Sequence, residues 1–200
     1  MIWDTFSGIY DLAETAYNRK VYTRTGEIVA EYIDPRDNVL ECACGTGAIS
    51  VCIAAKCRAL TATDMSVGML RQCEKKLKNH YNVRIRKADL MHLKVRDGSF
   101  DKVVAGNVLH LLDDPAGALA ELRRVCRPGG LIILPTYVNK QLGRTNLGAR
   151  AVALAGVKFK EEFDAVSYAE FLEGLGCEIE EYRIADGRMP CAIAIVRNPS

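Results

Sequence analysis

The sequence has no strong excess of charge of one sign and no long hydrophobic run. Its 200 residues include 27 Lys and Arg against 25 Asp and Glu, a formal net charge of +2. The basic residues form no block, so the charge balance calls for neither nucleic acid nor an anionic membrane as a partner. With 49% hydrophobic and 26% charged residues, the composition is typical of a globular chain. We therefore expect one domain over residues 1–200 with its own core.

Histidine is scarce, and a secretory signal is missing. His80, His92 and His110 are scattered, so Cys42 and Cys44 resemble half of a zinc site with no second pair at finger spacing. We expect no metal. The chain begins MIWDTFSG, without a basic segment followed by an apolar one. A cytoplasmic protein is therefore expected, with its eight cysteines reduced and mostly buried as small hydrophobic side chains.

The signal that is present is an alternation of short apolar runs and helical segments. The expected strands and helices are strands at 38–42, 60–63, 83–86, 101–105 and 131–134, and helices at 48–56, 66–78 and 115–126. Parallel strands need crossovers of this length, and strands buried on both faces lose their polar alternation. The pattern predicts an α/β fold with a doubly wound, mostly parallel, Rossmann-like sheet and helices on both faces.

Two segments of the chain depart from this alternation. Residues 11–33 predict one or two amphipathic helices, so we interpret residues 1–36 as an N-terminal helical lid. Residues 137–166 are expected to form a cap insertion. Its apolar part is suited to peripheral contact with a lipid surface, although it is too short and too interrupted to span a membrane. Packing into the core is the alternative for this segment.

A helix at 168–175 and strands at 177–184 and 191–197 complete the expected elements. The turn Asp186-Gly187-Arg188 is too short for a crossover, so the last two strands must pair antiparallel. The prediction is a seven-stranded sheet whose last strand is antiparallel.

Residues 39–47 read VLECACGTG, where a strand ends in small residues at the position at which a doubly wound sheet binds its ligand. The dinucleotide fingerprint needs a third glycine that the run G-T-G-A-I-S lacks, and no Gly-Lys-Ser/Thr of a P-loop follows the strand. A glycine pair alone also occurs where a strand and a helix merely pack tightly. The loop by itself is therefore weak evidence.

Two acidic residues strengthen this signal. Asp64 and Asp89 follow successive strands, so both are expected at the same edge of the sheet. Asp64 is placed to accept hydrogen bonds from ribose hydroxyls, and Asp89 from the amine of a base. Taken singly, Asp64 also fits a helix cap and Asp89 a turn. Their joint placement favours an adenosyl ligand.

In this order, the segments resemble those of the class I S-adenosylmethionine-dependent methyltransferases, and more closely the small enzymes of ubiquinone and menaquinone biosynthesis. The matching stretches are VLECACGTG, ATDMS, KADLMHL, SFDKVVAGNVLHLLDDP and ELRRVCRPGGLIIL. The family usually has three alternating glycines in its first motif. Here Ala43 replaces the first of them, and we expect a narrower approach to the cofactor and not a lost site.

The resemblance implies S-adenosylmethionine as the cofactor and a role for each matching residue. The cofactor-binding residues it implies are Glu41, Ala43, Gly45 and Gly47 in the loop, Asp64 and Met65 at the ribose and ring, Asp89 and Leu90 at the adenine edge, and Asn107 at the methionine end. Within the acceptor site, Tyr10, Tyr22 and Tyr137 are candidates for binding the substrate, although aromatic residues at this spacing also pack helices onto domains.

His110 is the best candidate for a general base, because it follows Asn107 by three residues in the loop after the fourth strand. The alternative is a histidine without chemistry. The function predicted is methyl transfer to a small, apolar, lipid-like or quinone-like acceptor, with no nucleic-acid partner. An NAD(P)-dependent oxidoreductase and a non-catalytic cofactor-binding module that regulates a partner are the alternatives.

Overall fold

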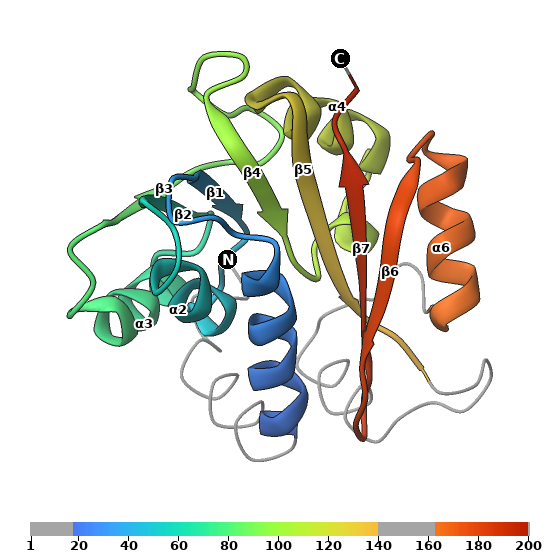
Figure 1. Cartoon of the computed structure of the whole chain (residues 1–200), viewed down its shortest axis with the longest axis horizontal. Helices are drawn as coiled ribbons and strands as arrows, with labels where there is room; N and C mark the ends of the chain where they lie inside the picture. Colours follow the sequence, from blue (N-terminus) through green and yellow to red (C-terminus); the bar gives the residue numbers. More distant parts are fainter. Residues whose placement is uncertain (1–17, 140–162, 200) are drawn as a thin grey trace.

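The computed structural model describes residues 18–139 and 163–199 and contains a seven-stranded sheet (Figure 1). The strands are β1 (Asn38–Cys42), β2 (Ala59–Asp64), β3 (Val83–Lys87), β4 (Phe100–Ala105), β5 (Cys126–Tyr137), β6 (Ile179–Ala185) and β7 (Cys191–Arg197). Their spatial order is β3-β2-β1-β4-β5-β7-β6, and β7 runs antiparallel to both of its neighbours. The expected doubly wound sheet with an antiparallel last strand is confirmed.

Three of the described helices begin after a residue whose side chain accepts a hydrogen bond from the first turn. The helices are one over residues 18–31, α2 (Ala48–Ala54), α3 (Val67–Leu77), the 3-10 turn η1 (Leu109–Leu111), α4 (Pro115–Val125) and α6 (Ala165–Gly174). Ser66 accepts from the Met69 N–H, Asp114 from the Gly117 N–H, and Asp164 from the Ser167 N–H. The cap at Asp164 makes α6 begin earlier than the predicted residue 168.

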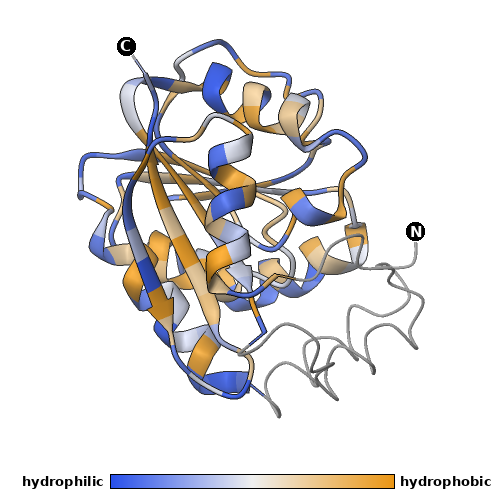
Figure 2. Cartoon of the chain, turned by 90° about the vertical axis from the view of Figure 1, so that its right-hand side faces the viewer, coloured by the Kyte–Doolittle hydropathy of each residue, from blue (hydrophilic) through white to orange (hydrophobic). Residues whose placement is uncertain are grey.

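Helices cover both faces of the sheet, and each face has its own core. Ile132 and Leu134 of β5 pack on the side of α4 and α6, whereas Leu131 and Ile133 pack on the side of helix 18–31, α2 and α3. The central strands are accordingly hydrophobic along most of their length (Figure 2). This two-sided burial explains the near-continuous apolar runs from which the parallel sheet was predicted.

Helix 18–31 lies against the sheet through Val21, Ile28 and Val29, which are almost fully buried. Gly26 permits close contact with α2, since a Cβ atom at this position would lie 2.7 Å from the Cys52 Sγ. The expected helical segment is thus present from residue 18 onward. Tyr10 and most of the expected cap at 137–166 lie outside the described residues.

The fifth strand is longer than predicted. The residues Pro128-Gly129-Gly130, which precede the strand predicted at 131–134, belong to β5. The register between β5 and β4 shifts between Phe100 and Lys102, and Asn198 exchanges backbone hydrogen bonds with Gly129 and Gly130. Gly129 has a φ of 69°, which glycine adopts at little cost. A bulge within a strand and a turn before a strand share the same glycine signal.

The eight cysteines are free thiols, and seven of them are buried, which confirms the expectation that most act as small hydrophobic side chains. Cys52 is only partly buried. Among residues 18–139 and 163–199, none of the helices combines the length and the apolar character that a membrane crossing requires.

Candidate ligand-binding site

A cavity of about 340 Å³ lies at the carboxyl ends of β1, β2 and β4 and beyond β3. The chain leaves β1 toward β2 on one side and returns to β4 on the other, so this is the switch point at which doubly wound sheets bind ligands. The predicted residues that line the cavity are Tyr22, Glu41, Ala43, Gly45, Asp64, Met65, Asp89, Leu90 and Asn107. The structure therefore brings together most of the predicted cofactor-binding residues.

The loop between β1 and α2 turns sharply through three residues in the left-handed region. Ala43, Gly45 and Gly47 have φ angles of 53°, 54° and 83°. The expected alternation of glycine positions is thus present in the backbone, and alanine occupies the first of them. A left-handed conformation costs a residue with a Cβ roughly 1–2 kcal/mol, so Ala43 is held there by the surrounding structure.

The two glycines serve different purposes. A Cβ atom at Gly45 would meet nothing within 4 Å, and Gly45 lines the cavity, so this position leaves space for a ligand beside the backbone. A Cβ atom at Gly47 would lie 2.8 Å from the Cys73 Sγ and 3.3 Å from the Cys73 Cα. Gly47 is outside the cavity lining and allows α2 to pack closely against α3.

Asp64 fixes the loop to the end of β2. Its Oδ2 accepts a hydrogen bond from the Gly45 N–H at 2.9 Å, and its Oδ1 accepts one from the Ser66 N–H at 2.8 Å. Each carboxylate oxygen has two lone pairs and can accept more than one hydrogen bond. The helix-cap and ligand interpretations of Asp64 are therefore compatible.

Glu41 is a buried carboxyl group in the cavity wall. Only 2% of the residue is exposed, and its Oε2 accepts a hydrogen bond from the Ser50 Oγ at 2.5 Å. Burial raises the pKa of Glu41 to about 8, although the Ser50 bond opposes this shift. With this pKa Glu41 is mostly protonated at neutral pH, so the negative charge of the cavity comes from the Asp64 and Asp89 side chains. No Lys or Arg is among the described residues that line the cavity. The cavity thus favours a ligand with positive charge.

The edge of the cavity near β3 combines a carboxylate with apolar side chains. The Asp89 Oδ1 accepts a hydrogen bond from the Met91 N–H at 2.9 Å. The Leu90 side chain is buried, whereas Met65 remains 42% exposed although it is apolar. This combination suits a flat aromatic ring with a polar edge.

Asn107 holds the loop after β4. It has a φ of 54°, which asparagine tolerates better than most residues. Its N–H donates to the Pro135 carbonyl at 2.8 Å, and its Oδ1 accepts from the Tyr137 N–H at 2.8 Å. The cavity wall formed by this loop is therefore fixed to β5.

His110 is not among the residues that line the cavity. It is buried within η1, and its ring meets the Phe163 ring edge-on with the centroids 6.2 Å apart. Burial lowers the pKa of His110 to about 4, so the imidazole is neutral at neutral pH. The turn that buries Leu109 and His110 leaves Leu111 and Leu112 lining the cavity instead.

Tyr22 and Tyr137 form a pair at another wall. Their ring centroids are 5.4 Å apart, with the planes at 68°. Only Tyr22 lines the cavity, and its hydroxyl is buried without a hydrogen-bond partner among the described residues. Tyr137 packs behind it. A buried hydroxyl in this state is costly, so the Tyr22 hydroxyl is available for a ligand.

Several lining residues were not predicted from the sequence. The main ones are Cys44, Thr46, Ile49, Ala88, Leu111 and Leu112. Cys44, Thr46 and Ile49 adjoin the glycine loop, so their proximity in sequence was the available signal. The sequence contains no signal for Leu111 and Leu112, because the pattern of residues 109–112 does not indicate which of these four side chains face a cavity.

Comparison with known proteins agrees with this geometry. Residues 40–134 match a family model described as a methyltransferase domain. An uncharacterized chloroplastic methyltransferase of Arabidopsis thaliana is 33% identical over 122 residues, 56% of this chain and 34% of the relative. The demethylmenaquinone methyltransferase of Lactiplantibacillus plantarum is 33% identical over 102 residues, 48% of this chain and 43% of that enzyme. This chain therefore spans less than half the length of either relative.

The fold is also found in solved structures. A geranyl diphosphate methyltransferase in complex with S-adenosylmethionine superposes with a TM-score of 0.68, over 88% of this chain and 85% of the other, at 12% sequence identity. At this identity the likeness shows the fold alone.

Proposed function

We propose that the chain transfers a methyl group from S-adenosylmethionine to a small acceptor that is apolar, lipid-like or quinone-like, because its residues 40–134 match the family model of a methyltransferase domain. The observation that carries the proposal is the charge of the cavity. Asp64 and Asp89 line it together with the protonated carboxyl of Glu41, and no Lys or Arg is found among its described lining residues. S-Adenosylmethionine has a positive sulfonium and a positive ammonium group, so its charge complements this lining.

The same lining disfavours a nicotinamide dinucleotide. The pyrophosphate of that cofactor is anionic and requires close approach to backbone N–H groups at the start of a helix. Ser50 occupies the position of the third fingerprint glycine, and its hydroxyl is bonded to the buried Glu41. An anionic group at this loop would lie near the Asp64 carboxylate, which accepts the Gly45 N–H, and this argues against the oxidoreductase alternative.

The residues of the cavity suit each part of the cofactor. Asp64 would accept hydrogen bonds from the ribose hydroxyls, while Asp89 and the Leu90 N–H would bind the polar edge of the adenine. The open space at Gly45 would admit the methionine part, and Glu41, which accepts the Ser50 hydrogen bond, would support the loop. When bound, S-adenosylmethionine supplies a methyl group already activated on a sulfonium sulfur.

The remaining work of the protein is to orient the acceptor and to exclude water. Leu111, Leu112 and Val108 give the cavity an apolar wall, and the Tyr22 hydroxyl offers it a hydrogen bond. An apolar ring with a polar substituent would use both. The relative from Lactiplantibacillus plantarum is named for demethylmenaquinone, which supports a quinone-like acceptor. A base role for His110 would require this buried ring to reach the cavity, and stays a prediction.

The experiment that tests the proposal supplies S-adenosylmethionine with a demethylated naphthoquinone and measures S-adenosylhomocysteine formation together with the mass of the quinone. The expected result is one methyl group added per S-adenosylhomocysteine formed. Substituting Tyr22→Phe removes the free hydroxyl and keeps the ring, so it should raise the KM for the quinone with little effect on cofactor binding. Cofactor binding without methyl transfer to any apolar acceptor would support a non-catalytic module instead.

A further inference from the structure

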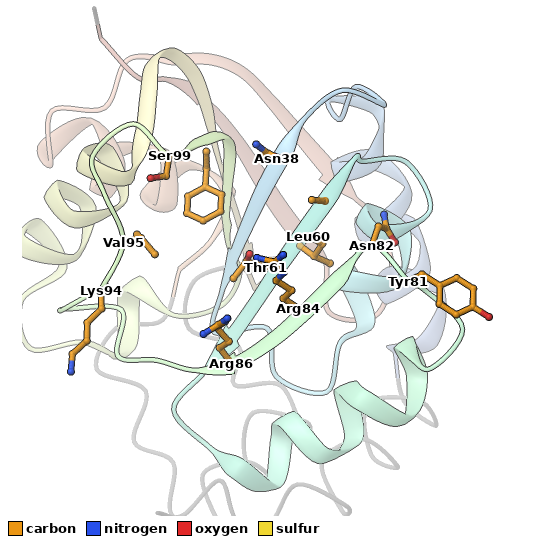
Figure 3. Close-up of a pocket in the computed structure, with 12 residues that line it drawn as sticks. Asn38, Leu60, Thr61, Tyr81, Asn82, Arg84, Arg86, Lys94, Val95 and Ser99 are labelled. Carbon is orange, nitrogen blue, oxygen red and sulfur yellow. The ribbon is translucent and has the colours of Figure 1, made fainter.

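A second cavity, of about 620 Å³, lies on the sheet near the amino ends of β1, β2 and β4 (Figure 3). It shares no lining residue with the cofactor cavity. Arg84 and Arg86 extend from β3, Thr61 from β2, and Lys94 and Ser99 come from the segment before β4. We call this cavity the basic groove.

The basic groove has an uncompensated positive charge. Arg84, Arg86 and Lys94 are exposed, and no Asp or Glu is among the described residues that line it. None of these three side chains forms an ion pair or a hydrogen bond with the described part of the chain. Their charges are left to solvent or to a ligand.

Two arginines close to the groove in sequence or space, by contrast, form ion pairs with acidic residues. Arg124 contacts the Asp97 carboxylate at 2.5 Å, and Arg127 contacts the Asp101 carboxylate at 2.8 Å. Asp97 and Asp101 lie close in sequence to the groove residues Ser99 and Phe100, and both are neutralised by cations outside the groove. The groove is therefore electrostatically positive and not part of a mixed surface network.

The spacing of the cations suits an extended anionic strand. Arg84 and Arg86 are alternate residues of β3, so they lie on one side of the strand about 6.6 Å apart along it. Lys94 stands on the neighbouring segment, to one side of them (Figure 3). Beside the other end of β3, the Tyr81 side chain points away from the molecule and is fully exposed. Positive grooves combined with exposed aromatic rings are typical of surfaces that bind single-stranded nucleic acid.

We propose that the basic groove binds a single strand of nucleic acid, with Arg84, Arg86 and Lys94 contacting phosphates and Tyr81 stacking on a base. The expectation of no nucleic-acid partner rested on the lack of a basic block in the sequence. The groove combines Arg84 and Arg86, alternate residues of β3, with Lys94 of the segment before β4. The sequence alone does not show that these residues lie close together in space. This inference does not depend on the methyl acceptor.

An acidic peptide fits less well. It would add to the outer edge of β3 through backbone hydrogen bonds, whereas the groove lies on the face of the sheet, over β2 (Figure 3). Charged residues on an edge strand also discourage aggregation. That role explains cations on β3, but it explains neither Lys94 across the groove nor the exposed ring of Tyr81.

The test is fluorescence anisotropy of the full chain with a labelled oligouridylate of about 12 nucleotides. Three phosphate contacts predict a slope of about −2 for the logarithm of the binding constant against the logarithm of salt concentration. The double substitution Arg84→Gln and Arg86→Gln should bring the slope to about −0.7 and weaken binding at least tenfold at low salt. Tyr81→Ala should weaken it by about tenfold, while Tyr81→Phe should preserve it.

The matched control is the double substitution Lys75→Gln and Lys78→Gln, which removes two exposed charges from the end of α3 outside the basic groove. It should change the affinity less than twofold. An equal loss in this control, a salt slope near zero, or stronger competition by polyglutamate than by unlabelled oligouridylate would overturn the proposal. S-Adenosylmethionine binding should be unchanged in the Arg84→Gln, Arg86→Gln variant, which separates this test from that of the cofactor site.

Discussion

The backbone N–H of Gly45 donates a hydrogen bond to the carboxylate of Asp64 over 2.9 Å. This bond joins the loop after β1 to the end of β2, and both residues line the same cavity. A single side chain thus shapes the glycine loop, and the same side chain is the one that we propose for binding the ribose. Substitutions at Asp64 are expected to affect both stability and affinity, and substitutions in the loop should separate the two effects.

Replacing Asp64 with alanine should lower the free energy of unfolding by about 1–3 kcal/mol, because the Gly45 and Ser66 N–H groups lose their acceptor. The affinity for S-adenosylmethionine should fall at least tenfold. Asp64→Asn keeps one acceptor oxygen, so it should retain more stability than affinity. Urea unfolding and calorimetric titration measure the two quantities. Unchanged affinity in Asp64→Ala would remove this residue from the ligand site.

The two glycines of the loop should respond differently to alanine. In Gly45→Ala the new methyl group enters open space, so the protein should lose only about 1–2 kcal/mol of stability through backbone strain and should bind S-adenosylmethionine much more weakly. In Gly47→Ala the methyl group meets Cys73, so stability should fall further. Thermal unfolding without S-adenosylmethionine compares the stability of the two variants, and the shift of Tm on adding it compares their affinity for the cofactor. Equal cofactor affinity in Gly45→Ala and the unsubstituted chain would contradict the proposed approach of the ligand.

Glu41 should make the protein less stable as the pH rises. The pKa of its carboxyl is raised from 4.5 to about 8, so between these values the folded chain holds a proton that the unfolded chain has lost. The free energy of unfolding should fall by up to about 1.4 kcal/mol per pH unit in this window. Glu41→Gln keeps an acceptor for Ser50 and should abolish this contribution. The check is the free energy of urea unfolding measured from pH 5 to 8. The same pH dependence in Glu41→Gln and in the unsubstituted protein would contradict this role of Glu41.

His110 should make the protein less stable as the pH falls, which is the opposite of the effect of Glu41. Its pKa is lowered from 6.5 to about 4, so between these values the unfolded chain binds a proton that the folded chain excludes. Stability should therefore be lost as the pH falls from 6.5 toward 4, and His110→Gln should reduce this dependence.

Turnover on an identified acceptor tests the catalytic role of His110. Undiminished turnover in His110→Gln would leave the histidine as a core residue, whereas a loss of kcat at unchanged KM would support a base.

The parallel sheet and the position of the ligand cavity were predictable from the sequence. Apolar runs separated by helical segments give every strand except β5 within one or two residues of its true ends. Asp64 and Asp89 mark the carboxyl edge because parallel strands bring their ends together. The orientation of single side chains was not predictable in the same way. His110 turns inward because Phe163, distant in sequence, packs against it.

The same limit applies to surfaces assembled from separate segments. Tyr137 was expected in the pocket, yet it packs behind Tyr22, whose own position depends on how helix 18–31 lies against the sheet. The cations of the basic groove likewise meet only after β3 and the segment before β4 have folded side by side. Local periodicity determines which strands and helices form, whereas these contacts depend on tertiary packing.

The most direct measurement is a calorimetric comparison of S-adenosylmethionine, S-adenosylhomocysteine and the nicotinamide dinucleotides on the unsubstituted protein. An acidic cavity at the switch point predicts binding of both adenosyl compounds at one site per chain, with the dinucleotides at least a hundredfold weaker, a difference of about 2.7 kcal/mol. Tighter binding of a dinucleotide, or no binding of either adenosyl compound, would contradict the assignment of this cavity.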